Sequence, residues 1–192
     1  CGGAAPGSFG FEPVDAEGYA AWGVEFLKYD NCYADNINGS TPQSRYTAMS
    51  EALNATGKPI FFAMCEWGEA GPAVWGPRVS NSWRTTADIS DYWWAMGELA
   101  DLTAEWFDQA GPGGWNDPDL LEVGNGGMTT SEYRCQFSIW ALLKAPLIIS
   151  TDLTVATPET LAILGNAEVI AVNQDSLGVA GRVVEERPPE PQ

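Results

Sequence analysis

The sequence predicts an α/β protein with a parallel sheet, and two observations carry this prediction. Short apolar runs alternate along the chain with segments that have the apolar spacing of helices, which is the order of a parallel sheet covered by helices. Some of these runs are continuous, as expected for strands that are buried on both faces. A chain of 192 residues, with 45% hydrophobic and 18% charged residues, is large and apolar enough to bury a core.

The first half of the chain contains three predicted strands and one helix. Residues 24–30 form an apolar run that ends in polar side chains, and we interpret them as a buried strand. A helix is predicted over 42–55, with Thr41 as its N-cap and apolar residues at helical spacing. The continuous apolar run 60–65 is the next strand, and a short strand over 82–84 follows a loop rich in glycine and proline.

The second half repeats the alternation of strands and helices. The predicted elements are a helix over 92–109, a short strand over 114–116, a helix over 130–145, a strand over 147–150 and two short helices over 158–164 and 167–172.

Five strands in regular alternation with helices favour a (β/α)8 barrel. Such a barrel usually has about 250 residues, so the 192 residues of this chain predict an incomplete one. Polar motifs follow the ends of four predicted strands, at Asp30, 65–67, 84–88 and 116–119. Because the active sites of such barrels lie at the carboxyl ends of the strands, we expect these four motifs to converge on one face.

The composition limits the chemistry and the partners. There is no histidine, which excludes a Ser-His-Asp triad, a Cys-His pair and a two-histidine zinc site. The net charge of −17 argues against nucleic acid and anionic membrane surfaces as partners. No apolar run approaches the roughly 20 residues of a membrane-spanning helix, and no Gly-x-Gly-x-x-Gly or Walker motif follows a strand. We expect no metal and no cofactor.

Carboxylates, lysine, tyrosine and cysteine must then supply any acid, base and nucleophile. Paired carboxylates beside tryptophans are typical of glycoside hydrolases, in which one attacks the sugar and the other protonates the leaving oxygen. Lys28 and Asp30 lie on one face of their strand, and a neighbouring lysine keeps an aspartate ionised, as a nucleophile needs. Arg84 and Asp88 are four residues apart. An ordinary ion pair explains Lys28 and Asp30 equally well, and for Arg84 and Asp88 taken alone an ordinary salt bridge is the better interpretation.

Two further motifs have both a structural and a functional interpretation. The segment 116–119 has the composition of a turn, but its place after a strand makes Asp119 a candidate binding residue. Cys65 and Trp67 share a strand face by alternation. A cysteine such as Cys65 is often only a small buried hydrophobic residue. Trp67 has a flat apolar face of the kind that stacks on sugars or fills cores.

In their order along the chain, these motifs resemble one family closely, the α-galactosidases (melibiases) of glycoside hydrolase family 27. The resemblance extends from Cys1 to about Arg182, and Val172 to Asp175 matches the end of the family's barrel. The matching motifs are Lys-Tyr-Asp-Asn-Cys (28–32), Cys-Glu-Trp-Gly (65–68), Trp-Arg-Thr-Thr-Ala-Asp-Ile (83–89), Gly-Pro-Gly-Gly-Trp-Asn-Asp-Pro-Asp (111–119) and Leu-Lys-Ala-Pro-Leu (143–147).

The resemblance implies a retaining mechanism with Asp30 as nucleophile and Asp88 as acid/base. It also implies a disulfide between Cys1 and Cys32, with Cys65 and Cys135 free. The residues expected to line the galactose pocket are Lys28, Cys65, Trp67, Arg84 and Asp119.

By the same resemblance, residues 1–182 are part of a (β/α)8 catalytic domain and 183–192 a linker-like tail. They would carry about strands 4 to 8 with their helices, without the family's first strands and its C-terminal β domain. We therefore expect the chain to be a piece of a longer secretory protein (extracellular, periplasmic or lysosomal) and to be inactive in isolation.

The predicted function is removal of terminal α-D-galactose from an oligosaccharide or glycoconjugate. Alternatives within the family are an α-N-acetylgalactosaminidase, a β-L-arabinopyranosidase and an isomalto-dextranase. The first needs space at the sugar's 2-position, for which Cys65 and Trp67 are bulky. A non-catalytic carbohydrate-binding relative is the alternative from another class, and the presence of both Asp30 and Asp88 argues against it. The sequence does not predict the oligomeric state.

Overall fold

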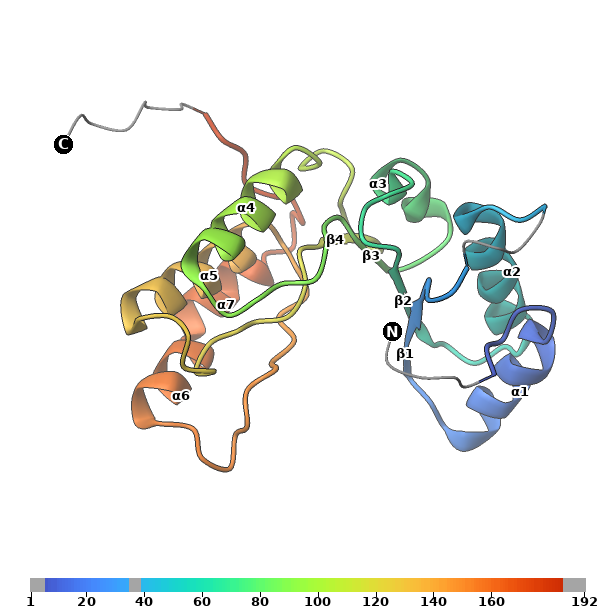
Figure 1. Ribbon diagram of the computed structural model, residues 1–192, viewed down its shortest axis with the longest axis horizontal. Coiled ribbons are helices and arrows are strands. Elements are labelled where there is room, and N and C mark those ends of the chain that lie inside the picture. Colours follow the sequence, from blue (N-terminus) through green and yellow to red (C-terminus); the bar gives the residue numbers. More distant parts are fainter. Residues whose placement is uncertain (1–5, 35–38, 185–192) are drawn as a thin grey trace.

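The computed structural model describes residues 6–34 and 39–184, so Cys1 and most of the predicted tail lie outside the described residues. The sheet is parallel and has four strands in the order β1-β2-β3-β4 (Figure 1). Each strand therefore lies beside the strand that precedes it in sequence, as consecutive crossovers produce. This confirms the predicted α/β class. The strands are β1 (Phe26–Asp30), β2 (Phe61–Cys65), β3 (Ser82–Arg84) and β4 (Trp115–Asp117).

Helices flank the sheet in two groups (Figure 1). The first group comprises α1 (Glu12–Trp22), α2 (Pro42–Ala55), α3 (Pro72–Trp75) and the 3-10 helix η1 (Gly76–Arg78). The second comprises α4 (Trp93–Ala104), α5 (Thr130–Leu142), α6 (Pro158–Leu164) and α7 (Ala167–Asn173).

Each group of helices has its own apolar core. The first core joins α1 and α2 to β2 and β3, with Tyr46, Met64 and Trp83 almost fully buried. The second lies among α4, α5 and α6 around Trp140 and also includes Leu121 and Val123. The second core includes no residue of the four strands that the structure describes, so the first core is the one that packs directly on the sheet.

Helices α1, α3 and η1 were not predicted, and three of the predicted elements end earlier or form only in part. Helix α4 ends at Ala104 rather than Gln109, and α5 ends at Leu142 because Lys144 has a left-handed backbone (φ 59°) and Pro146 follows. The predicted strand 147–150 is only a parallel bridge between Ile149 and Leu121.

The prediction that strand β1 is buried was wrong. Its residues alternate between exposed and half-buried, with Phe26, Lys28 and Asp30 on the exposed face. Because β1 is the first strand of the sheet, only β2 pairs with it among the described residues. The exposed face of β1 therefore carries two of the predicted site residues.

Candidate active site

The parallel register brings the predicted site motifs to one edge of the sheet. Asp30 at the end of β1 is the register partner of Cys65 at the end of β2, and Arg84 at the end of β3 is the partner of Asp117 in β4. All four strands therefore end at the same level. Trp67, Asp88 and Asp119 follow within a few residues of these ends.

Arg84 connects most of the predicted site. Its Nη2 lies 2.9 Å from Asp119 Oδ2 and 3.2 Å from Asp88 Oδ1, and its Nη1 lies 3.7 Å from Cys65 Sγ. The side chain of Arg84 is only 1% exposed and that of Asp119 8%, whereas that of Asp88 is 73% exposed. Among the described residues, Arg84 Nε has no hydrogen-bond partner. The guanidinium thus joins a buried carboxylate to an accessible one.

Asp119 is fixed by its backbone as well as by Arg84. Its φ of 88° is uncommon for a residue other than glycine, and its N–H donates to Asp117 Oδ1 at 2.8 Å. Its Oδ2 accepts the N–H of Ile89 at 2.9 Å, and its carbonyl accepts the indole N–H of Trp140. These contacts tie the segment after Asp88 to the end of β4.

Trp67 makes direct contact with Asp88. The Trp67 indole N–H donates to Asp88 Oδ1 over 3.1 Å. The backbone of Trp67 is left-handed (φ 58°), as is that of Gly68 (φ 80°), so a tight turn aims the ring across the end of β3. Asp88 therefore receives hydrogen bonds from two sides, from Arg84 and from Trp67.

The Cys65 thiol lies within the electrostatic reach of the other candidates. Burial raises the pKa of Cys65 to about 11, so the thiol is neutral at ordinary pH. The charged groups that act on it are, in decreasing order, Arg84, Asp30, Lys28 and Asp88. Lys28 and Asp30 thus belong to the same cluster, although the structure gives them no direct contact with Arg84. Asp30 Oδ1 accepts the N–H of Asn31 at 2.7 Å.

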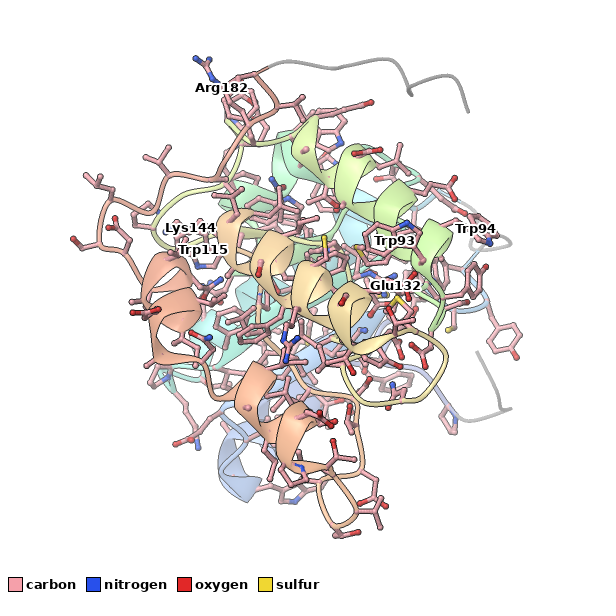
Figure 2. The ribbon with its side chains drawn as sticks, turned by 90° about the vertical axis from the view of Figure 1, so that its left-hand side faces the viewer. Trp93, Trp94, Trp115, Glu132, Lys144 and Arg182 are labelled. Carbon is pink, nitrogen blue, oxygen red and sulfur yellow. The ribbon has the colours of Figure 1, made fainter. Side chains whose placement is uncertain are left out.

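The tryptophans divide between core and surface. Trp83 and Trp140 are fully buried, and Trp67 is half-buried at the site. Trp93 and Trp94 are 45% and 65% exposed at the start of α4, on the opposite side of the molecule in Figure 2 from Lys144 and Trp115. A tryptophan in this sequence is therefore not by itself a sign of sugar binding.

The remaining predictions are tested only in part. Cys32 is disulfide-bonded, and Cys65 and Cys135 are free thiols. The predicted partner of Cys32 is Cys1, which lies outside the described residues, so this pairing stays a prediction. Within residues 6–34 and 39–184, no group of histidine, cysteine or carboxylate side chains could hold a metal ion, and no helix is long and apolar enough to cross a membrane.

Residue Glu66 was not among the predicted site residues. It is fully buried directly after β2, and burial raises the pKa of its carboxyl to about 7. Alternation alone had placed Glu66 on the face opposite Cys65 and Trp67. A buried acid next to two candidate binding residues is the signal that sequence reasoning could have used.

Arg84→Ala should strongly destabilise the fold. It would leave the Asp119 carboxylate buried without its partner, and breaking a buried ion pair costs about 3–5 kcal/mol. Arg84→Lys keeps the charge but loses the two-pronged geometry, so we expect a smaller loss. Urea unfolding of the intact protein measures both.

The matched control for this prediction is Arg78→Ala, because Arg78 is an exposed arginine in η1. Its substitution should change the free energy of unfolding by no more than about 0.5 kcal/mol. An equal loss from both alanine variants would mean that the Arg84 contacts contribute nothing to stability.

A parallel α/β sheet with carboxylates, an arginine and a tryptophan at its carboxyl edge is an arrangement typical of the catalytic domains of glycoside hydrolases. The family model described as alpha galactosidase A matches residues 1–175. The chain belongs to this family, the α-galactosidases of glycoside hydrolase family 27.

Curated relatives agree with this assignment. The chain is 58% identical over 180 residues to alpha-galactosidase 3 of Arabidopsis thaliana. The matched region covers 94% of this chain and 40% of that protein. It is 55% identical over 185 residues to an alpha-galactosidase of Oryza sativa subsp. japonica, with 96% and 44% covered. The chain thus spans less than half the length of these relatives.

A solved structure has the same fold. Alpha-galactosidase I from Mortierella vinacea superposes with a TM-score of 0.92 at 40% identity, over 97% of this chain and 52% of that chain. The alpha-galactosidase of Saccharomyces cerevisiae, solved with raffinose, gives a TM-score of 0.86 at 38% identity, over 91% and 44% of the two chains.

Proposed function

We propose that the intact protein is a retaining, exo-acting α-galactosidase that removes terminal α-D-galactose from an oligosaccharide or glycoconjugate. The observation that carries the proposal is the contact of Arg84 with both Asp88 and Asp119 at the strand edge that also bears Asp30. Membership of the α-galactosidase family supports the choice of sugar.

In the proposed mechanism, Asp30 is the nucleophile and Asp88 the acid/base. The Asp30 carboxylate attacks the anomeric carbon while Asp88 donates its proton to the leaving oxygen, and a glycosyl ester forms on Asp30. Asp88 then removes a proton from water, which displaces Asp30 from the same carbon. Two inversions leave the α configuration unchanged. Such a mechanism requires the two carboxyl groups to stand about 5–5.5 Å apart.

The other site residues would hold the galactose. Arg84, Lys28 and Asp119 offer charged donors and acceptors for its hydroxyl groups, and Trp67 offers an apolar face to its C–H surface. The neutral Cys65 thiol would pack against the ring without adding charge. A β-L-arabinopyranosidase of Geobacillus stearothermophilus is only 26% identical to this chain, with a TM-score of 0.76, so the galactosidase assignment has the stronger support.

The wider organisation belongs to the same proposal. Residues 1–182 would form about strands 4 to 8 of a (β/α)8 catalytic domain, followed by the tail 183–192. Among the described residues β1 pairs only with β2, and its other edge fits a strand that has a further barrel strand beside it in the intact protein. A Cys1–Cys32 disulfide fits a protein of the secretory route, where such bonds persist.

The stereochemistry of the product tests the proposal. The intact protein should release galactose from an aryl α-galactoside, and proton NMR before mutarotation should show the α-anomer first. A β-anomer as the first product would contradict the retaining mechanism. No release from the α-galactoside, with release from an aryl β-L-arabinopyranoside, would contradict the choice of substrate.

A further inference from the structure

We propose that Glu66 is a positioning residue that holds the turn of residues 66–71, and thereby sets the hydrogen bond from Trp67 to Asp88. The proposal rests on the proposed function for the role of Asp88, but its structural part is independent of it. The Glu66 side chain is 0% exposed.

Glu66 fastens the turn from inside. Its Oε2 accepts the N–H of Ala70 at 2.8 Å, and its carbonyl accepts the N–H of Glu69 at 3.2 Å. Trp75 of α3 donates its indole N–H to the carbonyl of Ala70 at 3.0 Å. The N–H of Ala70 is therefore bound by the side chain of Glu66, and its carbonyl is bound by the side chain of Trp75.

The turn has little room to move and is conformationally strained. A Cβ atom added to Gly68 would lie 2.3 Å from the carbonyl oxygen of Thr85, directly after Arg84. Trp67 itself holds a left-handed backbone (φ 58°), which is costly for a bulky residue and persists only where surrounding contacts enforce it. Among the described residues, the Glu66–Ala70 hydrogen bond is one contact in place to do so.

The position of Trp67 matters because of what its ring contacts. The Asp88 side chain is 73% exposed, and its Oδ1 is held by Arg84 Nη2 at 3.2 Å and by Trp67 Nε1 at 3.1 Å. Arg84 is fixed by its own buried contacts. Trp67 is the partner whose place depends on the turn, so a loosened turn would misplace the carboxyl that donates the proton.

The carboxyl of Glu66 is incompletely partnered. Its Oε1 is buried and, in the described part of the chain, has no hydrogen-bond partner. Burial raises its pKa to about 7, against a lowering by the N–H groups of Ala70 and Gly68 and a further rise from Glu69. Tyr46 of α2 lies within electrostatic reach of this carboxyl and donates its hydroxyl to the Cys65 carbonyl. The neutral carboxyl is thus favoured at mildly acidic pH.

The raised pKa of Glu66 makes the stability of the folded protein depend on pH in a definite direction. A carboxyl whose pKa rises from 4.5 to about 7 on folding binds its proton more tightly in the folded state. The stability that it contributes is therefore present below pH 4.5 and is lost as the pH rises through 7. Glu66→Gln removes this titration and keeps an oxygen for the Ala70 N–H, so its unfolding midpoint should change less than that of the wild type between these two pH values.

The deciding experiment uses two substrates on the intact protein. Methyl α-galactoside needs protonation of its leaving group, whereas 2,4-dinitrophenyl α-galactoside does not. Glu66→Ala should lower kcat/KM for the methyl substrate by on the order of tenfold or more, as expected for a misplaced acid. It should leave kcat/KM for the dinitrophenyl substrate nearly unchanged, because this ratio reports formation of the ester on Asp30, which needs no acid with that leaving group. Glu66→Gln should stay near the wild type on both.

Two further variants separate positioning from general destabilisation. Glu69→Ala is the matched control, because Glu69 is an exposed carboxylate in the same turn, and it should behave as the wild type. Trp67→Phe, which removes the indole N–H, should lower kcat/KM more for the methyl than for the dinitrophenyl substrate. The double variant should show no larger difference between the two substrates than either single variant. Equal losses of kcat/KM on both substrates, or a Glu69→Ala effect as large, would overturn the proposal.

A readout without activity keeps the proposal testable if the wild type releases no galactose. Hydrogen exchange of the 66–71 segment should be faster in Glu66→Ala than in Glu69→Ala, and no difference would overturn the positioning role. Should Glu66→Ala not fold, Glu66→Asp, which is one methylene too short for the Ala70 N–H, takes its place in both measurements.

Discussion

Asp30→Asn in the intact protein should abolish the release of galactose from an aryl α-galactoside, lowering kcat by on the order of 10³-fold or more. The amide cannot form the glycosyl ester that the proposed mechanism requires. The fold should tolerate the change, because Asp30 is exposed at the end of β1 and its Oδ1 accepts the N–H of Asn31, which an amide oxygen also accepts. Steady-state kinetics with a 4-nitrophenyl substrate measures the loss.

Asp101→Asn is the matched control for this substitution. Asp101 is an exposed aspartate on α4, away from the strand edge, so the same chemical change there should leave kcat unaltered. Equal thermal unfolding midpoints for the two variants would show that the loss is chemical. Wild-type rates in Asp30→Asn would mean that another group attacks the sugar.

The strands that the sequence could predict are those with strong local patterns. The run 60–65 is continuously apolar, and β2 forms there with four of its five residues buried. Helix α2 has the bounds predicted from Thr41 and Pro42, since a capping box and a proline fix its start locally. Local chemistry was sufficient in these places.

The sequence was a poor guide where an element depends on distant contacts: helix α1 was not predicted, and one predicted strand hardly forms. Helix α1 buries only Glu12 and Ala16, so its sequence has little apolar periodicity, and packing against α2 stabilises it. The predicted strand 147–150 has a strand-like composition but only one bridge, at Leu121. Pro118 and the left-handed Asp119 interrupt the chain after β4 before a longer ladder could form.

The site shows the same division. Polar residues after apolar runs identified Arg84, Asp88 and Asp119 because parallel strands end at one edge. The spacing of four residues suggested that Arg84 pairs with Asp88, but its shorter contact is with Asp119, 35 positions away, a pairing that only the fold creates. Glu66 was not predicted as a site residue because alternation places it away from the pocket. In our proposal it acts indirectly, by holding the turn that positions Trp67.

Asp88→Ala should separate protonation from attack. General acids contribute about 10²–10⁴-fold, so hydrolysis of methyl α-galactoside should fall by that amount, while 2,4-dinitrophenyl α-galactoside should still form the ester on Asp30. The ester should then accumulate, because no base activates water, and a burst of dinitrophenol should precede a slow steady state.

Azide should relieve that block, and the product it forms identifies the missing group. The Asp88 carboxylate is 73% exposed and, in the described part of the chain, is held by Arg84 and Trp67, so its removal should open an accessible space next to the anomeric carbon. An anion entering there attacks the face opposite Asp30 and should give α-galactosyl azide, the configuration of the substrate. Asp101→Ala, the control on α4, should form no azide adduct. A β-galactosyl azide from Asp88→Ala would mean that the azide replaces the nucleophile, and the roles of Asp30 and Asp88 would have to be exchanged.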